Sequence, residues 1–213
     1  MEKQIKSRQR VADHGEVYTA EREVKAMCDL VSDECNRIDS RFLEPACGNG
    51  NFLAEILTRK LSVVKRKYKK SVIDYEKNSL LAVSSLYGVD ILADNVAACR
   101  ERLFKLWQNE YKAVSKAAYS EDTAKSIRFV LSKNIVCGNA LTLMCVDDEG
   151  KDTAEPIVFS EWAFIMGGNI QRQDFTFAEL LNRDEQVTFD ENADEGKFIS
   201  RYVCNYRRLW ENG

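Results

Sequence analysis

The sequence predicts an α/β protein with a Rossmann-like, doubly wound and mostly parallel sheet. Short apolar segments of strand length alternate with longer segments of helical periodicity. The first of these strands leads into a helix through two glycines in FLEPACGNGNFL, residues 42–53. A second apolar segment, LYGVDI at residues 86–91, ends next to an acid. This alternation favours parallel strands that are joined by right-handed helical crossovers.

The first elements are defined by apolar spacing and by Pro45. Helical spacing over residues 20–35 predicts a helix with Thr19 as its N-cap and two acids in its first turn. RFLEPA, residues 41–46, predicts a short buried strand that stops at Pro45. Helical spacing returns after the glycines at Leu53, Ile56, Leu57, Leu61 and Val64.

The later elements are predicted by the same signals. A polar helix over residues 74–84 precedes the LYGVDI strand, and Asp94 is placed to cap the helix that follows that strand. NIVCGNAL and PIVFSEWAFIM, residues 134–141 and 156–166, predict a third and a fourth strand. From residue 183 onward the charge density rises and the periodicity fades, so no element is predicted there.

Composition narrows the possible classes of function. A net charge of -3 over 213 residues gives no global basic field, although a local patch can still bind nucleic acid. Seven cysteines without a CxxC pair, together with the lack of a secretory signal or a long apolar segment, predict a reduced, cytoplasmic chain with no membrane partner. His14 is the only histidine, which disfavours Ser/His or Cys/His catalysis and rules out a metal site with several histidines.

The glycine turn predicts a ligand site. Ligands of doubly wound sheets lie beyond the carboxyl ends of the strands, where Gly48 and Gly50 allow close approach of the backbone. The turn lacks the third glycine of a dinucleotide fingerprint, which disfavours a pyrophosphate cradle. Asp90 closes the second strand, where an acid accepts hydrogen bonds from ribose hydroxyls. The combination favours a nucleoside without phosphates, although each residue alone is also explained by a tight turn or a helix cap.

Four segments resemble the cofactor-binding motifs of S-adenosylmethionine-dependent DNA methyltransferases of the adenine-N6 kind, as found in restriction-modification systems. They are, in this order, GEVYTAEREVKAMCDLV, FLEPACGNGNFL, YGVDI and CGNAL. The resemblance implies one S-adenosylmethionine-binding domain over residues 1–213, with an N-terminal helical motif at 10–36 and a cofactor-binding core at 40–145. The C-terminal part, residues 146–213, is left unassigned, and the implied sheet is incomplete in its C-terminal half.

The resemblance also implies a role for each motif residue. Tyr18 and Thr19 would border the methionine part of the cofactor, Glu44 would hold its ammonium group, and Asp90 would bind the ribose hydroxyls. The family usually has Asp where this chain has Asn139, but an amide oxygen can still accept from an amine. Ile91 would lie on the adenine ring, and Asn139 would bind the adenine amino group. The glycine turn would pack against the methionine part of the cofactor, and it consists of Ala46, Cys47, Gly48, Asn49 and Gly50.

One motif of the resembled family is absent. In that family, the hydrogens of the adenine amine are accepted by an Asn or Asp that is followed by two prolines and an aromatic residue. This sequence has no two adjacent prolines. The nearest catalytic replacement is Asn169 in WAFIMGGNI. The alternative interpretation is a plain Gly-Gly-Asn turn, which these residue types favour. Trp162 and Phe164 can stack on a base, but core packing is the preferred interpretation.

The resemblance implies adenine-N6 methyl transfer to DNA. The alternative is a catalytically inactive or split-subunit homologue that acts by binding the cofactor and a partner, because the residues after 169 cannot supply the remaining strands of a full methyltransferase fold. A partner subunit would then complete the fold. Methylation of something other than a nucleobase is a third possibility.

Two further segments have two interpretations each. The basic run RKLSVVKRKYKK, residues 59–70, is typical of a solvated helix face and less so of a phosphate-contacting helix end. YVCNYRRLW, residues 202–210, mixes arginines with aromatics and can bind a partner or nucleic acid, or pack as a terminal strand or helix.

Overall fold

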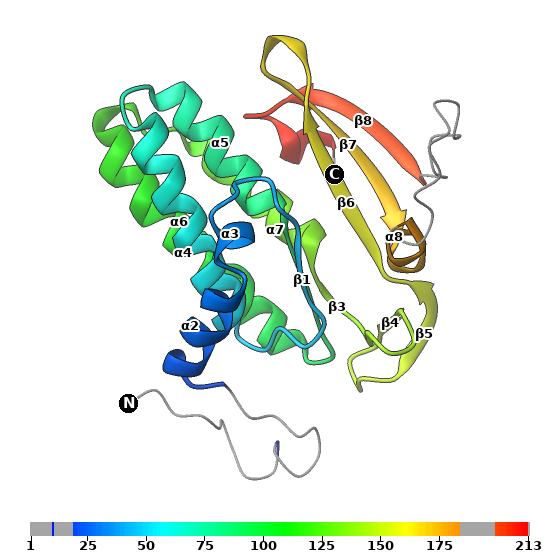
Figure 1. Cartoon of the computed structure of the whole chain (residues 1–213). Coiled ribbons are helices and arrows are strands. Elements are labelled where there is room, and N and C mark those ends of the chain that lie inside the picture. The colour runs from blue at the N-terminus through cyan, green and yellow to red at the C-terminus, as the bar shows by residue number, and fades with distance from the viewer. Residues whose placement is uncertain (1–9, 11–18, 184–198, 213) are drawn as a thin grey trace.

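Three short parallel strands form the centre of the protein. They are β1 (Phe42–Glu44), β2 (Leu86–Asp90) and β3 (Ile135–Cys137), in the spatial order β1-β2-β3. The computed structural model (Figure 1) describes residue 10 and residues 19–183 and 199–212. Parallel pairing of the first three predicted strands is therefore confirmed.

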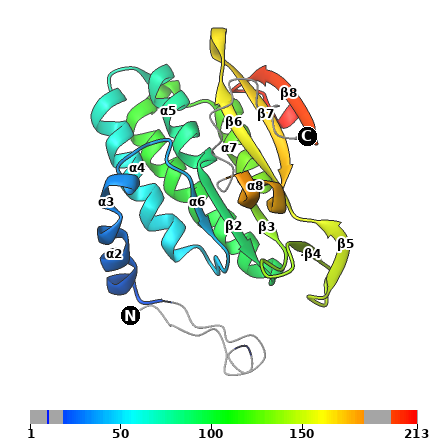
Figure 2. The ribbon, with the colours of Figure 1, turned by 45° about the vertical axis from the view of Figure 1, so that its right-hand side comes forward.

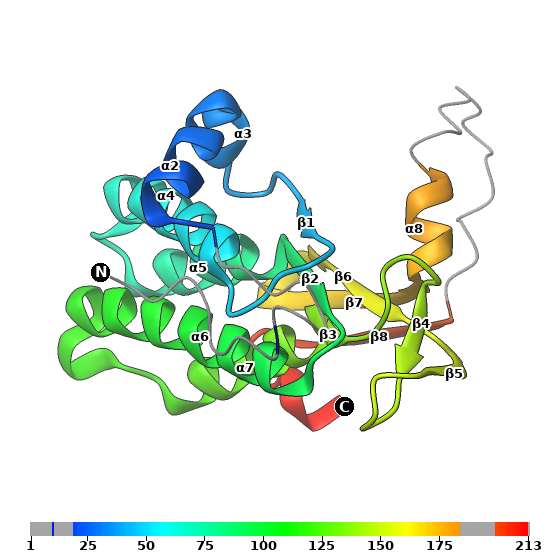
Figure 3. The same ribbon diagram turned by 90° about the horizontal axis from the view of Figure 1, so that it is seen from below.

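Helices cover one face of this sheet. Figure 2 shows β2 and β3 between the helices and a second sheet, and Figure 3 shows the same layers from below. The apolar positions predicted after the glycine turn are all buried, which confirms the first crossover helix. The helices are α2 (Glu21–Leu30) and α3 (Ser32–Cys35), which pack on α4 (Asn51–Tyr68), then α5 (Val72–Ser84), α6 (Ala93–Ser115), the 3-10 turn η1 (Lys116–Ala118) and α7 (Glu121–Asn134).

The predicted N-terminal helix is interrupted. The backbone of Val31, with φ -120° and ψ 36°, is not helical, so residues 20–35 form α2 and α3 instead of one helix. The N-cap of α2 is Ala20, which makes no side-chain cap, and the prediction of Thr19 as the cap is wrong. The carbonyl of Thr19 instead accepts a hydrogen bond from Asn51 Nδ2 of α4 at 3.1 Å. A contact with α4 therefore fixes the entry to α2.

The next two predicted helices also differ in detail. α5 begins after Ser71, whose hydroxyl accepts from the backbone N–H of Asp74, and much of this polar helix is buried. The N-cap of α6 is Leu92, so the prediction that Asp94 caps this helix is wrong. Asp94 lies in the first turn of α6, where its carboxylate pairs with Arg10 at 2.6 Å. An acid in that turn still stabilises the helix through its dipole.

The predicted fourth strand forms but does not extend the parallel sheet. It is β6 (Val158–Phe164), and it pairs antiparallel with β7 (Asn169–Thr176), which pairs antiparallel with β8 (Ser200–Asn205). Two glycines at positive φ, Gly167 and Gly168, turn the chain back directly and leave no room for a crossover helix. The doubly wound pattern is therefore not confirmed, and what the structure supports is an α/β protein with a three-stranded parallel core and its helices.

Several elements were not predicted. They are the hairpin β4 (Met144–Val146) and β5 (Asp152–Pro156), the 3-10 turns η2 (Met166–Gly168) and η3 (Leu209–Asn212), the strands β7 and β8, and α8 (Phe177–Arg183). The segment 202–210 packs as the end of β8 and the start of η3, as one of its two interpretations expected.

The strand β2 lies between two hydrophobic clusters. Leu86 packs with the helices, whereas Tyr87 and Val89, which point to the opposite face, pack with Phe159 of β6 and Phe177 of α8. β2 is buried along its whole length. β1 is not, because it is an edge strand, and the side chain of Leu43 is 40% exposed. The prediction that the first strand is buried is wrong for this reason.

Lys60 is a buried cation in α4. Its ammonium group donates to the carbonyl oxygens of Ile38 and Ser40 and to the hydroxyl of Ser85. These bonds fasten the segment before β1 to the helical layer. Burial lowers the pKa of Lys60 from 10.5 to about 8. The folded chain therefore binds fewer protons at this site than the unfolded chain does.

Replacement of Lys60 with methionine is expected to destabilise the protein more at high pH than at neutral pH. Because the pKa is lower in the folded state, the Lys60 side chain adds stability as the pH rises from about 8 to 10.5, by up to about 3 kcal/mol. The Lys60→Met variant lacks that increase. Urea unfolding of both proteins near pH 7 and near pH 10 would measure the two differences, and equal differences would contradict the expectation.

Candidate functional site

A pocket opens at the carboxyl ends of the three parallel strands. Its volume is about 630 Å³, which lies within the range of about 300–1,000 Å³ that is typical of small-molecule sites. The loops that follow β1, β2 and β3 form most of its wall, and Thr19, the start of α4 and Asn95 of α6 complete it. The lining consists of Thr19, residues 44–49, 51–52 and 90–92, Asn95, and residues 138–141.

Nine of the eleven predicted cofactor-binding residues line this one pocket. Gly50 does not line it: this residue is the N-cap of α4 with φ 85°, and a Cβ there would lie 2.7 Å from Cys99 Sγ of α6. Gly50 therefore allows close packing of two helices. Tyr18 lies outside the described residues. The nine that line the pocket are Thr19, Glu44, Ala46, Cys47, Gly48, Asn49, Asp90, Ile91 and Asn139.

The carboxylate of Asp90 connects two loops of the pocket. One oxygen accepts from the backbone N–H of Gly48 at 2.8 Å. The other accepts from the backbone N–H of Leu92 at 2.9 Å and from Asn95 Nδ2 at 3.3 Å. Gly48 and Asp90 are thus in direct contact on one wall, and a ligand would lie against both. The positive φ of Gly48, 51°, turns its N–H toward the carboxylate.

Glu44, the last residue of β1, places a second carboxylate in the pocket. Burial raises the pKa of this carboxyl, and a hydrogen bond from the backbone N–H of Ala46 opposes the increase. A cationic group of a ligand would favour the ionised form and lower the pKa again. Among the described residues that line the pocket there are two carboxylates and no lysine or arginine. The wall is therefore better suited to a cation than to a phosphate.

Cys47 and Asn139 have defined partners in the wall. A hydrogen bond with Cys99 and burial both raise the pKa of Cys47, so its thiol stays neutral and is not an activated nucleophile. Asn139 accepts from the backbone N–H of Leu141 at 3.0 Å and donates to Asp152 Oδ1 of β5 at 3.0 Å. The β4–β5 hairpin therefore fixes the orientation of the Asn139 amide.

The structure does not bring Asn169 to this pocket. The hairpin between β6 and β7 lies at the opposite end of the strands from the loop after β1 (Figure 1). The carbonyl of Asn169 accepts from the backbone N–H of Ile165 at 2.9 Å, which closes the Gly-Gly-Asn turn. Trp162 packs edge-on against Phe129, with ring centroids 6.1 Å apart. Asn169 therefore belongs to a plain Gly-Gly-Asn turn, and Trp162 packs against Phe129, as the non-catalytic interpretation of each expected.

The basic run is also remote from the pocket. α4 starts at the pocket and runs away from it, so its last turn lies about 25 Å further along the helix axis. Lys65 pairs there with Glu110 of α6 at 2.8 Å. Basic residues in the last turn also stabilise the helix through its dipole. The last turn of the run is therefore a helix end remote from the pocket, whereas Lys60 near its start is buried.

Some residues of the pocket were missed. Asn95 is 1% exposed and bonds to Asp90, but in the sequence it appears as an ordinary helix residue. The available signal was its position one turn into the helix that follows Asp90. Leu141 is 95% exposed at the pocket, and an apolar residue directly after the third strand's turn was the corresponding signal.

The parallel core, the glycine turn and the pocket at the strand ends define an α/β protein that is compatible with the methyltransferase fold. Residues 20–186 match the family model described as MmeI, DNA-methyltransferase domain. This match covers more than half of the chain, so the chain belongs to that family, and the resemblance to DNA methyltransferases of restriction-modification systems is confirmed at this level. No curated protein and no solved structure gave a significant match.

The described part of the chain has neither a candidate membrane span nor a candidate metal cluster. None of its helices is both long and apolar enough to cross a membrane. No group of three or more His, Cys, Asp or Glu side chains within it is arranged to hold a metal ion.

Proposed function

We propose that this chain binds S-adenosylmethionine in the pocket and serves methyl transfer to adenine N6 of DNA in a cytoplasmic restriction-modification system. The observation that carries the proposal is the gathering of nine predicted cofactor residues on one pocket of about 630 Å³. Family membership supports the class of reaction. The methyl donor and the adenine specificity are inferred from the motif residues and their resemblance.

The charge of the pocket supports a sulfonium nucleoside. Glu44 would pair with the ammonium group of the cofactor, and the free lone pairs of Asp90 would accept from the ribose hydroxyls. Ile91 would lie on the adenine ring, and the Asn139 oxygen would accept from the adenine amine. With these contacts made, the turn around Cys47 and Gly48 would contact the methionine part of the cofactor.

S-adenosylmethionine supplies an activated methyl group for direct in-line displacement at the sulfonium carbon. The chain's contribution would be to position the donor, since orientation accounts for a large part of such rate enhancement. The Asn/Asp-Pro-Pro-aromatic motif that accepts the hydrogens of the adenine amine is absent from this sequence, and Asn169 lies away from the pocket. We infer that a partner subunit which completes the fold supplies this motif.

The Glu44→Gln variant is expected to bind S-adenosylmethionine about 10- to 100-fold more weakly than the wild type, because it loses one charge pair and keeps its shape. Its unfolding free energy should be unchanged or higher, since the variant removes a partly buried carboxylate whose burial cost is only partly offset by the hydrogen bond from the Ala46 N–H. Wild-type affinity should fall as the pH decreases through the raised pKa of Glu44, whereas the affinity of the variant should not.

Calorimetric titration at several pH values would measure these affinities. Glu101→Gln is a matched control because this carboxylate is 42% exposed on α6 and is absent from the pocket wall. Equal affinities of the wild type and the Glu44→Gln variant would remove the assigned role of Glu44. Transfer of a radiolabelled methyl group to DNA, followed by digestion to nucleosides, tests the reaction itself, and label on a base other than adenine would contradict it.

A further inference from the structure

The outer edge of β1 presents free backbone groups. The backbone N–H of Phe42 donates to the carbonyl of Ser85 at 2.9 Å, and the register aligns Phe42 with Leu86 and Glu44 with Gly88. Alternate residues of a strand bond to the same neighbour, so the N–H and C=O of Leu43 point away from β2. No strand of the described chain pairs with that side. An unpaired edge of this kind is a template for another strand.

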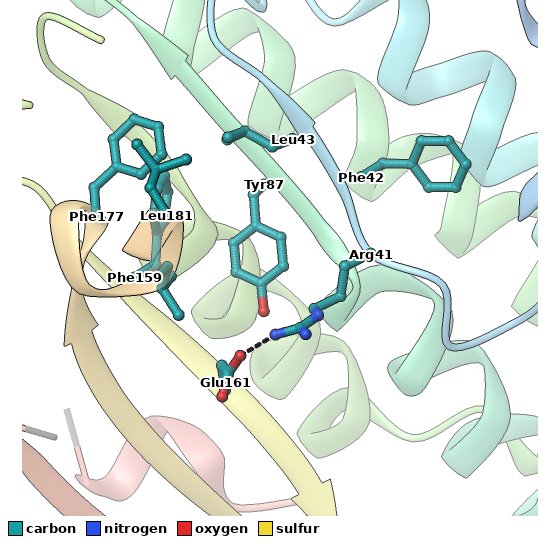
Figure 4. Close-up of a pocket in the computed structure, with 9 residues that line it drawn as sticks. Arg41, Phe42, Leu43, Tyr87, Phe159, Glu161, Phe177 and Leu181 are labelled. Carbon is teal, nitrogen blue, oxygen red and sulfur yellow. Dashed lines mark hydrogen bonds and ion pairs between the residues drawn. The ribbon is translucent and has the colours of Figure 1, made fainter. Parts of the chain in front are cut away.

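An apolar pocket of about 180 Å³ lies beside this edge (Figure 4). An apolar cavity of about 150 Å³ is large enough for a benzene ring, so this pocket matches one aromatic or large aliphatic side chain. The rings of Tyr87 and Phe159 meet edge to face at 5.3 Å, and Phe159 meets Phe177 in the same way at 5.3 Å. These contacts hold the wall in place before anything binds. Leu180 and Leu181 of α8 complete it.

Charge at the mouth of the pocket selects the occupant. Arg41 and Glu161 form an ion pair across it, which Figure 4 shows as a dashed line. Because these two charges already compensate each other, charge complementarity favours an uncharged side chain in the pocket. The apolar rim is open, since Leu43 is 40% and Leu181 46% exposed.

We propose that an extended segment of a partner protein adds to the edge of β1 and inserts one aromatic or large aliphatic side chain into this pocket. In this mode of recognition the main chain provides affinity and a side-chain pocket provides specificity. The edge is only three residues long and ends at Pro45, which has no N–H, so the inserted side chain carries most of the specificity.

The open end of the sheet supports this occupant. Parallel sheets normally have both faces covered, and here β6 and α8 cover the second face at β2 while β1 remains at the edge. The apolar pocket shares no lining residue with the larger pocket at the strand ends, and Glu44 is the one residue of β1 that lines the larger pocket. The inference therefore goes beyond the proposed function and does not require cofactor binding.

A synthetic peptide of seven residues, blocked at both ends, tests the proposal. Serine alternates in it with apolar residues, and phenylalanine occupies its centre. Saturating peptide is expected to slow amide exchange at Leu43 about tenfold, and replacement of the central phenylalanine with alanine should weaken binding about tenfold. Leu181→Arg, which places a charge at the rim, should weaken binding at least as much. Leu30→Arg is the matched control, because Leu30 is 86% exposed on α2.

Three results would overturn the inference. The first is unaltered exchange at Leu43 with the peptide at about millimolar concentration. The second is equal peptide binding by the wild type and the Leu181→Arg variant. The third is a wild-type dimer that Leu181→Arg converts to a monomer, which would make a second copy the occupant. S-adenosylmethionine titration of the same samples keeps the proposals separate, because its failure in the wild type counts against the proposed function alone.

Discussion

The Glu76→Ala variant is expected to lose about 3–5 kcal/mol of unfolding free energy, the cost of breaking a buried ionic network from one side. Glu76 of α5 is 0% exposed. One of its oxygens accepts from Tyr206 Oη at 2.6 Å and from Arg207 Nη2 at 2.6 Å, and the other accepts from Tyr111 Oη. Its removal leaves two buried hydroxyls without their acceptor and separates the end of β8 from the helical layer.

Urea unfolding of matched variants would test this expectation. Arg207→Gln should cost less than Glu76→Ala, because the Arg207 side chain is 40% exposed and water can replace part of its bonding. Glu110→Ala is the control on a neighbouring helix: this carboxylate is 40% exposed and pairs with Lys65, so a loss of at most about 1 kcal/mol is expected. Equal losses for Glu76→Ala and Glu110→Ala would show that the cluster does not anchor the C-terminal segment.

The parallel core could be predicted because its signals are local. Apolar spacing after the glycines and the short apolar strands depend on neighbours along the chain, and parallel pairing follows from the helical crossovers. The pairing of β6 could not be predicted in this way. It depends on the return of the chain at Gly167 and Gly168, and on contacts such as the hydrogen bond from Tyr87 Oη to the carbonyl of Ser160 at 3.2 Å.

Burial was the other property that local patterns did not predict. The exposure of Leu43 depends on the absence of a strand beside β1 in the described chain, and the burial of Lys60 depends on the carbonyls of Ile38 and Ser40 closing over it. Both are consequences of tertiary packing. A lysine in a basic run is normally read as solvated, and here its position at the start of that run faces the sheet.

The position of the pocket could be predicted because the carboxyl ends of parallel strands meet at one edge. The internal bonds of its wall could not. The contact of Gly48 with Asp90 requires the β1–β2 register, and the bonds of Asn139 require the β4–β5 hairpin. Asn169 was placed near the site on the assumption that its strand continued the parallel sheet, and the hairpin carries it to the other end.

The Asp90→Ala variant is expected to lose both cofactor binding and stability. Binding of S-adenosylmethionine should weaken about 100-fold or more, because a charged acceptor of two ribose hydroxyls is removed. Unfolding free energy should fall by about 2–4 kcal/mol, because the N–H groups of Gly48 and Leu92 lose their acceptor at 2.8 and 2.9 Å. Asp90→Asn, which keeps the shape and one acceptor, should lie between the wild type and Asp90→Ala in both measurements.

The two losses are separated by measuring unfolding with and without ligand. A ligand that binds only the folded state stabilises it in proportion to the logarithm of its concentration over Kd, so saturating S-adenosylmethionine should stabilise the wild type by a few kcal/mol and Asp90→Ala by almost nothing. Asp94→Ala is the control, since its carboxylate is 56% exposed and lies outside the pocket wall. If Asp90→Ala were destabilised yet gained as much from the ligand as the wild type does, Asp90 would be a structural clasp between the two loops, and the nucleoside would have to be held elsewhere.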